Sequence, residues 1–189
     1  MLKDILIKSA ELLNRDDIVN ELSLKNNFTQ NTMLENDILR LIHYYNYTIE
    51  CLCEKYFSLE FTDEVTSDKN RKIYYEYLSL EPIKIISVSL NNKNCYFFES
   101  SNYITVPNSN CTYNVKYSYV PKPILEISSK EHKINGVSNN LICYGIVSEF
   151  FASKNMFEES NYWHNKFMFE IFKSKTKLNK KMKATFTIW

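Results

Sequence analysis

Glycine is nearly absent from this chain: only Gly136 and Gly145 occur among its 189 residues. Glycines at these two positions cannot build the G-x-G-x-x-G or G-x-x-x-x-G-K-[S/T] loops that hold nucleotide phosphates, which excludes those classes of nucleotide-binding protein. The motifs H-E-x-x-H and G-x-S-x-G are missing as well. Few turns can use glycine at positive φ, so we expect asparagine to occupy many of these positions.

Long apolar runs are also missing. No stretch of 18 apolar residues occurs, and the sequence therefore predicts no membrane-spanning helix and no membrane partner. Asp4 and Glu11 interrupt the apolar residues at the start of the chain, where a secretory signal would show an uncharged run and a small-residue cleavage site. We expect a protein that is made in a cytoplasm.

Metal-binding patterns are scarce. The cysteines are odd in number at five, and the only close pair, Cys51 and Cys53, would face different sides of a helix. The histidines, His43, His132 and His164, have no metal-ligand spacing in the sequence, although a cluster in space stays open. We therefore expect reduced structural thiols, no metal and no cofactor.

Three acidic residues are the remaining candidates for chemistry. Glu149 and the adjacent pair Glu158 and Glu159 lie among aromatic residues, and two carboxylates can in principle act as general acid and base. No nucleophile, base or phosphate loop accompanies them, so ion pairing on a helix surface is the better interpretation. The sequence favours a protein that is not an enzyme and has no catalytic residue.

Charge is distributed unevenly, although the net charge is only +1. Beyond Ile171 there are six lysines and no acidic residue, which leaves 17 basic against 22 acidic residues, or −5, for the rest of the chain. A tail of one sign predicts docking on an acidic partner. A solvated, frayed terminus and weak contact with nucleic-acid phosphates are the alternatives. The residues of this predicted arm are Lys173, Lys175, Lys177, Lys180, Lys181, Lys183, Phe186, Ile188 and Trp189.

Apolar spacing predicts helices at both ends of the chain. Thr32 and Glu35 form a capping box that opens the strongest helix, expected over 32–56, and two short helices precede it. Two more helices are expected over 139–153 and 156–174, and the first of them should approach another helix closely at its glycine. The expected packing residues of this pair are Tyr144, Gly145, Phe157, Trp163, Phe167, Ile171 and Phe172.

Between the helical regions the apolar period changes to two. Tyr113, Val115, Tyr117 and Tyr119 alternate with polar residues and predict a strand with one buried face, while a slip at Ile85–Ile86 predicts a bulge or a strand buried on both faces. The sequence therefore predicts an α+β fold. Its expected parts are a helical core of four to five helices (1–57 and 132–174), a β-rich insert (58–131) and an extended basic C-terminal arm (175–189).

Several segments together resemble one known family. They are Leu39-x-Leu41-Ile42 with Asn46, Glu50 and Tyr56-Phe57; Tyr117-x-Tyr119-x-Pro121; Tyr144-Gly145 with Glu149-Phe150; Asn155 to Ser160 with Trp163 and Phe167; and the lysine-rich end with Trp189. This pattern is similar to that of the head–tail connector proteins (adaptor or head-completion proteins) of tailed bacteriophages. It departs from the family at Asn155, where glycine is expected, at Ser160, where alanine is expected, and in tail lysines that replace arginines.

The resemblance implies a structural virion protein of the phage neck. Connectors of this kind form a closed ring of about twelve copies below the portal. The implied partners are further copies of the chain, the portal protein, and a stopper or tail protein, while DNA passes through the channel without specific binding. The basic tail would dock on the portal or on a neighbouring copy, and the protein would stay in the host cytoplasm until assembly. The competing interpretation is a standalone helical protein-interaction module, such as a non-enzymatic regulator.

Overall fold

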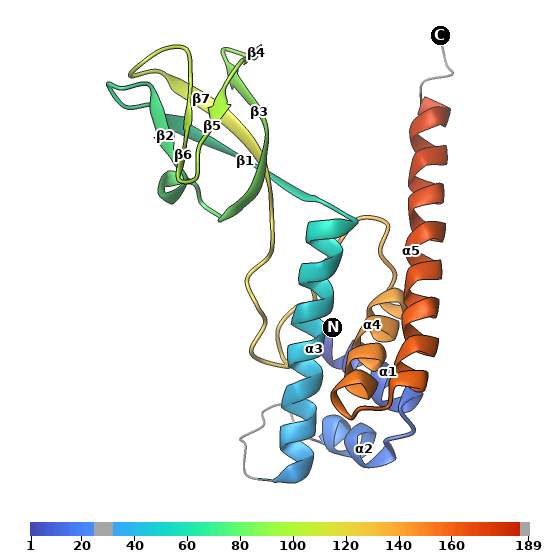
Figure 1. Ribbon diagram of the computed structural model, residues 1–189. Helices are drawn as coiled ribbons and strands as arrows, with labels where there is room; N and C mark the ends of the chain where they lie inside the picture. Colours follow the sequence, from blue (N-terminus) through green and yellow to red (C-terminus); the bar gives the residue numbers. More distant parts are fainter. Residues whose placement is uncertain (25–31, 186–189) are drawn as a thin grey trace. The chain divides into compact units, whose positions relative to one another are not determined.

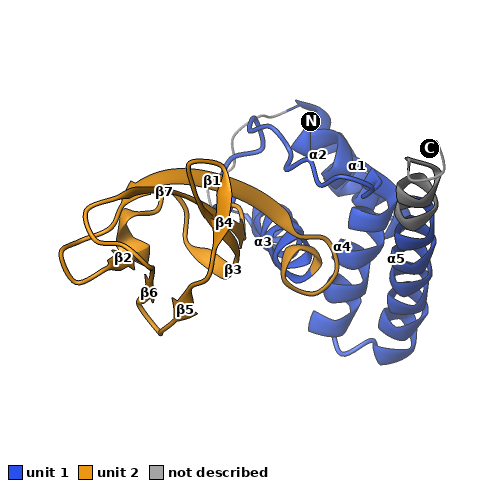
Figure 2. Cartoon of the chain, turned by 90° about the horizontal axis from the view of Figure 1, so that it is seen from above, with its two compact units in different colours: residues 1–51, 122–189 blue, residues 52–121 orange. Residues whose placement is uncertain are grey.

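The chain folds into two compact units, which Figure 2 shows in different colours. The structure is a computed structural model that describes residues 1–24 and 32–185, with side chains for 1–24 and 32–177. One unit, residues 1–51 and 122–189, is helical, and the other, residues 52–121, consists mostly of strands (Figure 1). The predicted α+β fold, with a β-rich insert between helical segments, is confirmed.

Helices α1 (Leu2–Leu12) and α2 (Asp16–Leu24) form a corner at the start of the helical unit. Each buries the apolar side of its helix, with Leu6 and Leu22 fully inaccessible to solvent. Asn14 lies between the two helices at φ 54°, a left-handed conformation that asparagine adopts more readily than most residues.

Helix α3 (Met33–Lys55) is the long helix that the capping box predicts. The hydroxyl oxygen of Thr32 accepts a hydrogen bond from the amide of Glu35 (3.1 Å), which satisfies one of the free amides at the start of the helix. The buried stripe of α3 repeats at three and four residues and consists of Ile38, Leu41, Ile42, Tyr45, Ile49 and Leu52.

Helices α4 (Asn139–Ser153) and α5 (Phe157–Thr185) form a hairpin. Ser138 caps α4 by accepting a hydrogen bond from the amide of Leu141 (3.3 Å). Asn155, in the turn between the helices, has φ 59°, so asparagine supplies the left-handed residue of this turn.

The end of α5 corrects one expectation. The helix continues past Ser174 to Thr185, where the sequence predicted an extended arm. The physical reason is local: residues 175–185 contain neither proline nor glycine, and lysine, leucine, methionine and alanine all favour a helix. The basic segment is therefore helical as far as Thr185, and residues 186–189 lie outside the described part of the chain.

The segment that returns from the β unit is held on α3, and this moves the boundary between the units. The side-chain amide of Asn46 donates to the carbonyl oxygen of Ile124 (2.8 Å), and its oxygen accepts from the amide of Ile124 (2.9 Å). The hydroxyl of Tyr45 accepts a hydrogen bond from the amide of His132 (2.8 Å). The segment from residue 122 onward therefore belongs to the helical unit, where the sequence placed the boundary at 131.

The β unit contains two antiparallel sheets. The larger has the strand order β1-β7-β3-β4 and the smaller has the order β2-β6-β5. The strands are β1 (Leu59–Thr66), β2 (Lys72–Tyr74), β3 (Pro82–Leu90), β4 (Lys93–Cys95), β5 (Phe98–Glu99), β6 (Tyr103–Thr105) and β7 (Thr112–Tyr119), with a short 3-10 helix η1 (Tyr75–Tyr77) after β2.

The core of the β unit is built on its central strand, β7. Tyr113, Val115 and Tyr117 are fully buried, as their alternation with polar residues predicts. The pairing of β3 with β7 shifts between Ile85 and Ser87, which confirms the predicted bulge.

Asparagine supplies most of the left-handed turns. Within the described residues, positive φ outside glycine occurs at Asn14, Arg71, Asn91, Asn92, Asn110 and Asn155. Asn91 and Asn92 connect β3 to β4 in a two-residue hairpin turn, whose favoured form needs positive φ at both positions. Asparagine here takes the role that glycine has in most proteins, as the scarcity of glycine in this chain predicts.

A hydrogen-bond network fixes the edge strand β1 on this core. The hydroxyl of Tyr117 donates to the Asp63 carboxylate (2.6 Å), and Ser79 donates to it through its amide and its hydroxyl (2.7 Å each). Burial alone would raise the pKa of Asp63, but these hydrogen bonds outweigh it and hold that pKa below its ordinary value of 3.8. Burial, followed by the hydrogen bond to Asp63, raises the pKa of Tyr117 to about 12.

We expect Asp63→Asn to destabilise the β unit by about 1–3 kcal/mol, because it removes the charged acceptor of three hydrogen bonds. Folding lowers the pKa of Asp63, so its contribution is complete above a pH of about 4 and is lost as the pH falls below that value. The difference between parent and variant should therefore close in acid. Free energies of amide exchange in β1 and β7 measure the β unit alone.

Glu64→Gln is the matched control, because Glu64 is an exposed carboxylate on the same strand. It should leave the exchange free energies close to those of the parent. A difference between parent and Asp63→Asn that stays constant from neutral to acid pH would contradict the role given to the charge.

Candidate functional site

Three helices meet at Gly145. A Cβ placed on this residue of α4 would lie 2.5 Å from Cγ2 and 2.9 Å from Oγ1 of Thr48 in α3, and 3.2 Å from Cε2 of Phe167 in α5. Real Cβ atoms essentially never come within 3.0 Å of another heavy atom, so only glycine fits without a shift of its neighbours. The expected close approach at Gly145 is present, and we call the meeting point of α3, α4 and α5 the three-helix junction.

A reciprocal pair of hydrogen bonds joins α4 to α5 one turn along from the glycine. The hydroxyl of Ser148 donates to the carbonyl oxygen of Ser160 (3.1 Å), and the hydroxyl of Ser160 donates to the carbonyl oxygen of Ser148 (3.0 Å). Both side chains are small, so the helices remain close. Ser160 thus links the helices through a small side chain.

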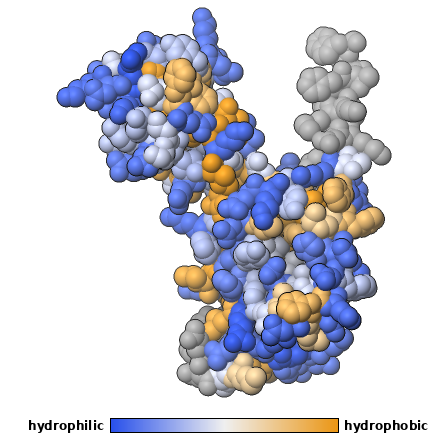
Figure 3. Space-filling model, viewed as in Figure 1, coloured by the Kyte–Doolittle hydropathy of each residue, from blue (hydrophilic) through white to orange (hydrophobic). Residues whose placement is uncertain are grey.

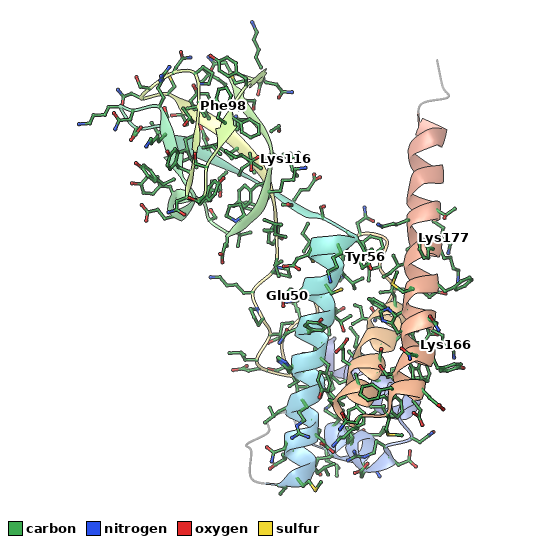
Figure 4. The ribbon with its side chains drawn as sticks, in the orientation of Figure 1. Glu50, Tyr56, Phe98, Lys116, Lys166 and Lys177 are labelled. Carbon is green, nitrogen blue, oxygen red and sulfur yellow. The ribbon has the colours of Figure 1, made fainter. Side chains whose placement is uncertain are left out.

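The rim of the three-helix junction is aromatic. The ring of Trp163 lies 5.6 Å from that of Tyr144 and 5.3 Å from that of Tyr162, measured between centroids. The Lys166 ammonium lies 4.4 Å from the centroid of Tyr162 and 4.5 Å from that of Trp163. Figure 4 labels this lysine on α5. Cation–π attraction holds its side chain against the rings.

A buried carboxylate fixes the start of α3. Asp37, only 5% exposed at its side chain, lies 2.9 Å from Arg15, which stands between α1 and α2. Its other carboxylate oxygen lies 3.6 Å from Arg40 and 3.6 Å from Lys154, the residue that follows α4. A buried charge is stable only with such partners, so Asp37 ties α3 to both pairs of helices.

The predicted packing residues divide into three groups. Gly145, Phe167 and Ile171 are buried, and Tyr144 and Trp163 are half-buried at the rim of the three-helix junction. Phe157 and Phe172 are 63% and 62% exposed, so their expected places in the helical core are wrong. Phe157 is the first residue of α5 and comes almost a turn before the serine at which α5 bonds to α4, and Phe172 follows the buried Ile171 on the exposed side of the helix.

The lysines of the predicted arm begin on α5. Lys173 and Lys177 are exposed, Lys175 is half-buried, and Figure 4 labels Lys177 on the helix. Lys173 pairs with Glu170 of its own helix at 2.9 Å. The side chains of Lys180, Lys181, Lys183, Phe186, Ile188 and Trp189 lie outside the described residues. Docking of this arm on a partner stays a prediction.

Sequence reasoning missed an exposed aromatic row on α5. Tyr162, Phe169 and Phe172 are 55%, 67% and 62% exposed. Figure 3 shows apolar side chains at the surface over this helix. The spacing of the row carried the signal, because with Asn165 it follows steps of three and four residues on a helix whose other side is also apolar. This row is the largest departure of α5 from an ordinary amphipathic helix.

The pKa shifts of Glu149 and Cys53 follow mainly from burial. Burial raises the pKa of Glu149, and the charge of nearby His164 opposes this to a smaller extent. The five cysteines are free thiols, and burial raises the pKa of Cys53 to about 11. Within residues 1–24 and 32–185, no group of three or more histidine, cysteine, aspartate or glutamate residues is arranged to hold a metal ion.

The surface of α3 has an open depression of about 430 Å³, which is lined by Asn36, Leu39, Arg40 and His43. In the part of the chain that the structure describes, no helix is long and apolar enough to cross a membrane.

No protein-family model matches the chain, and no curated protein matches it either. The interpretation of the site consequently depends on its own geometry and on the resemblance carried by its residues.

We expect Gly145→Ala to destabilise the helical unit. Overpacking costs about 1–3 kcal/mol, whereas alanine gains only about 1 kcal/mol over glycine in a helix. Thr48→Ala removes both close atoms, together with a hydroxyl that has no hydrogen-bond partner among the described residues. The double variant should therefore recover most of the lost stability in thermal unfolding.

The parent, the two single variants and the double variant form a double-mutant cycle, in which each chain is a control for the others. The prediction requires coupling between the two sites, so that Gly145→Ala is tolerated only beside the smaller residue. An equal effect of Gly145→Ala with and without Thr48→Ala would show that the two residues are not in close contact.

Proposed function

We propose that this chain is the adaptor of a tailed-phage neck, a ring protein that joins the capsid portal to the stopper or tail. The three-helix junction is the observation that supports this most. Gly145 and Phe167, which carry part of the resemblance to connector proteins, meet at this junction, and Trp163 lies on its rim. Part of the resemblance, which extends over most of the chain, therefore falls on one packed structural element.

The proposed role is structural and requires no reaction. Each copy in a ring of closed cyclic symmetry has the same neighbours, and the ring extends the DNA channel below the portal. A body of net charge −5 suits the wall of such a channel, because it repels the phosphate backbone and lets DNA pass without binding. The basic end of α5 has the opposite sign and suits an acidic surface on the portal or on a neighbouring copy.

The exposed aromatic row on α5 also suits the alternative function, a standalone helical interaction module. Particle mass separates the two functions. We expect the chain, co-expressed with the portal protein of the same phage, to give ring-shaped complexes of about twelve copies by electron microscopy and native mass spectrometry. A chain that stays monomeric in the presence of that portal would favour the module.

Removal of residues 178–189 is expected to abolish attachment to the portal and to leave the fold intact. Ile171 and Ser174, the last buried residues of α5 with described side chains, remain in the shortened chain. The removed segment contains three of the six lysines and all three apolar residues of the predicted arm. We expect these lysines and apolar residues to supply the contacts with the portal, so that attachment depends on them.

Co-sedimentation with DNA-filled capsids measures attachment, and thermal unfolding measures the fold. A full-length chain with Lys69→Gln and Lys93→Gln, two exposed lysines of the β unit, is the control for a loss of positive charge elsewhere. Attachment of the shortened chain at undiminished efficiency would exclude the arm as the docking element.

A further inference from the structure

The exposed side of α5 carries a regular seam. It consists of Glu158, Tyr162, Asn165, Phe169, Phe172 and Thr176, all exposed, at alternating steps of four and three residues. This is the spacing of the a and d positions in a coiled coil, and the aromatic residues occupy its middle. We call these six residues the outer seam of α5.

The outer seam is separate from the face that folds the chain. Ser160, Phe167 and Ser174 lie on the opposite side of α5, at the f positions of the same heptad, and contact or face the rest of the helical unit. A helix with one buried stripe normally presents polar residues to water on its other side. Three aromatic residues in line on that other side therefore indicate a second helical partner.

We propose that two copies of this chain pair through the outer seam of α5, with the helices antiparallel. Antiparallel helices place each a residue opposite a d residue of the partner helix. A register centred on position 167 puts Tyr162 opposite Phe172 of the second copy and Asn165 opposite Phe169 of the second copy. The same register puts Glu158 opposite Thr176 of the second copy, so all six seam residues of each helix have a partner.

The charges beside the seam select the antiparallel orientation. Glu159 and Lys173 occupy equivalent flanking positions, at opposite ends of the seam. Antiparallel pairing brings Glu159 of each copy to Lys173 of the other, and two-fold symmetry makes this contact twice. Parallel pairing would instead put Glu158 against Glu158 of the second copy at a seam position. Lys173 is available for the contact because its ion pair with Glu170 is on an exposed part of its own helix, with the lysine side chain 49% exposed.

Lys166 lies at the centre of the pair, where the two copies of this residue approach one another. Its ammonium is already held over the rings of Tyr162 and Trp163 within its own chain. This position directs the charge along the aromatic rim of the three-helix junction, which reduces its repulsion from the second copy. Lys166 therefore weakens the pairing less than an unattached lysine would.

The size of the seam indicates a weak dimer. Phe and Tyr side chains bury about 150–250 Å² each when fully covered, and the six aromatic residues of the pair begin partly covered. The interface therefore lies at or below the low end of specific protein interfaces, about 1,200 Å². We expect a monomer–dimer equilibrium that moves toward the dimer as the chain concentration rises.

This pairing does not depend on the proposed ring. A ring of closed cyclic symmetry repeats one head-to-tail contact, whereas the outer seam makes a self-complementary two-fold contact. The pair is accordingly a state of the free chain. If the chain does not pair through the seam, the proposed adaptor function is unaffected. If the chain does not bind the portal, the proposed pairing is unaffected.

Reversal of the flanking charges tests both the contact and its orientation. The full chain is measured by sedimentation equilibrium over a wide range of concentration, as parent, Glu159→Lys, Lys173→Glu and the double variant. Each single variant should lose the dimer, because it opposes like charges twice. The double variant should regain it, and an equimolar mixture of the two single variants should form a mixed dimer, since each contact then joins opposite charges.

Two further variants separate the seam from the rest of the helix. Phe169→Glu places a charge within the seam and should give a monomer, whereas Phe157→Glu changes an equally exposed phenylalanine of α5 outside the seam and should leave the dimer unchanged. Unchanged melting temperatures show that all variants fold. A parent chain that is monomeric at every concentration, or a double variant and mixture that stay monomeric beside a dimeric parent, would overturn the proposal.

Discussion

The close contact at Gly145 is the constraint on which the helical unit depends. Thr48 of α3 and Phe167 of α5 occupy the space that a side chain on α4 would need. Glycine in a helix costs about 1 kcal/mol relative to alanine, and the packing of three helices at one point offsets this cost. The other connections of α3 follow from that placement. Asp37 joins its first turns to both helix pairs, and Asn46 holds the returning segment along its side.

Helix α5 packs on the rest of the helical unit with one face and presents the opposite face to solvent. Its inner face contributes Ser160 and Phe167 to the three-helix junction, and its outer face leaves Phe169 and Phe172 in solvent. Because the inner face alone secures the fold, the exposed aromatic residues of the outer face are available for the proposed pairing of two copies. The β unit is organised differently, since its central strand and the network around Asp63 use their polar groups internally.

Expectations based on neighbouring residues were confirmed most often. The cap at Thr32, the slip in strand β3 and the left-handed asparagines all depend on a few consecutive residues, and each is present. Expectations that required knowledge of a distant partner fared less well. Phe157 is as apolar as a core residue but lies a turn before the contact between α4 and α5. The arm lysines continue a helix because no proline or glycine interrupts it there.

The order of elements, the change of period from helix to strand and the need for a close approach at the glycine could all be read from the chain. These features follow from side-chain spacing and from backbone freedom, which are local properties. Only the folded chain decided where the units divide, because the hydrogen bonds of Asn46 to Ile124 connect residues 78 positions apart. It also decided which aromatic residues of α5 are covered. Periodicity shows that a helix has two apolar faces, but only packing selects the one that the protein's own core buries.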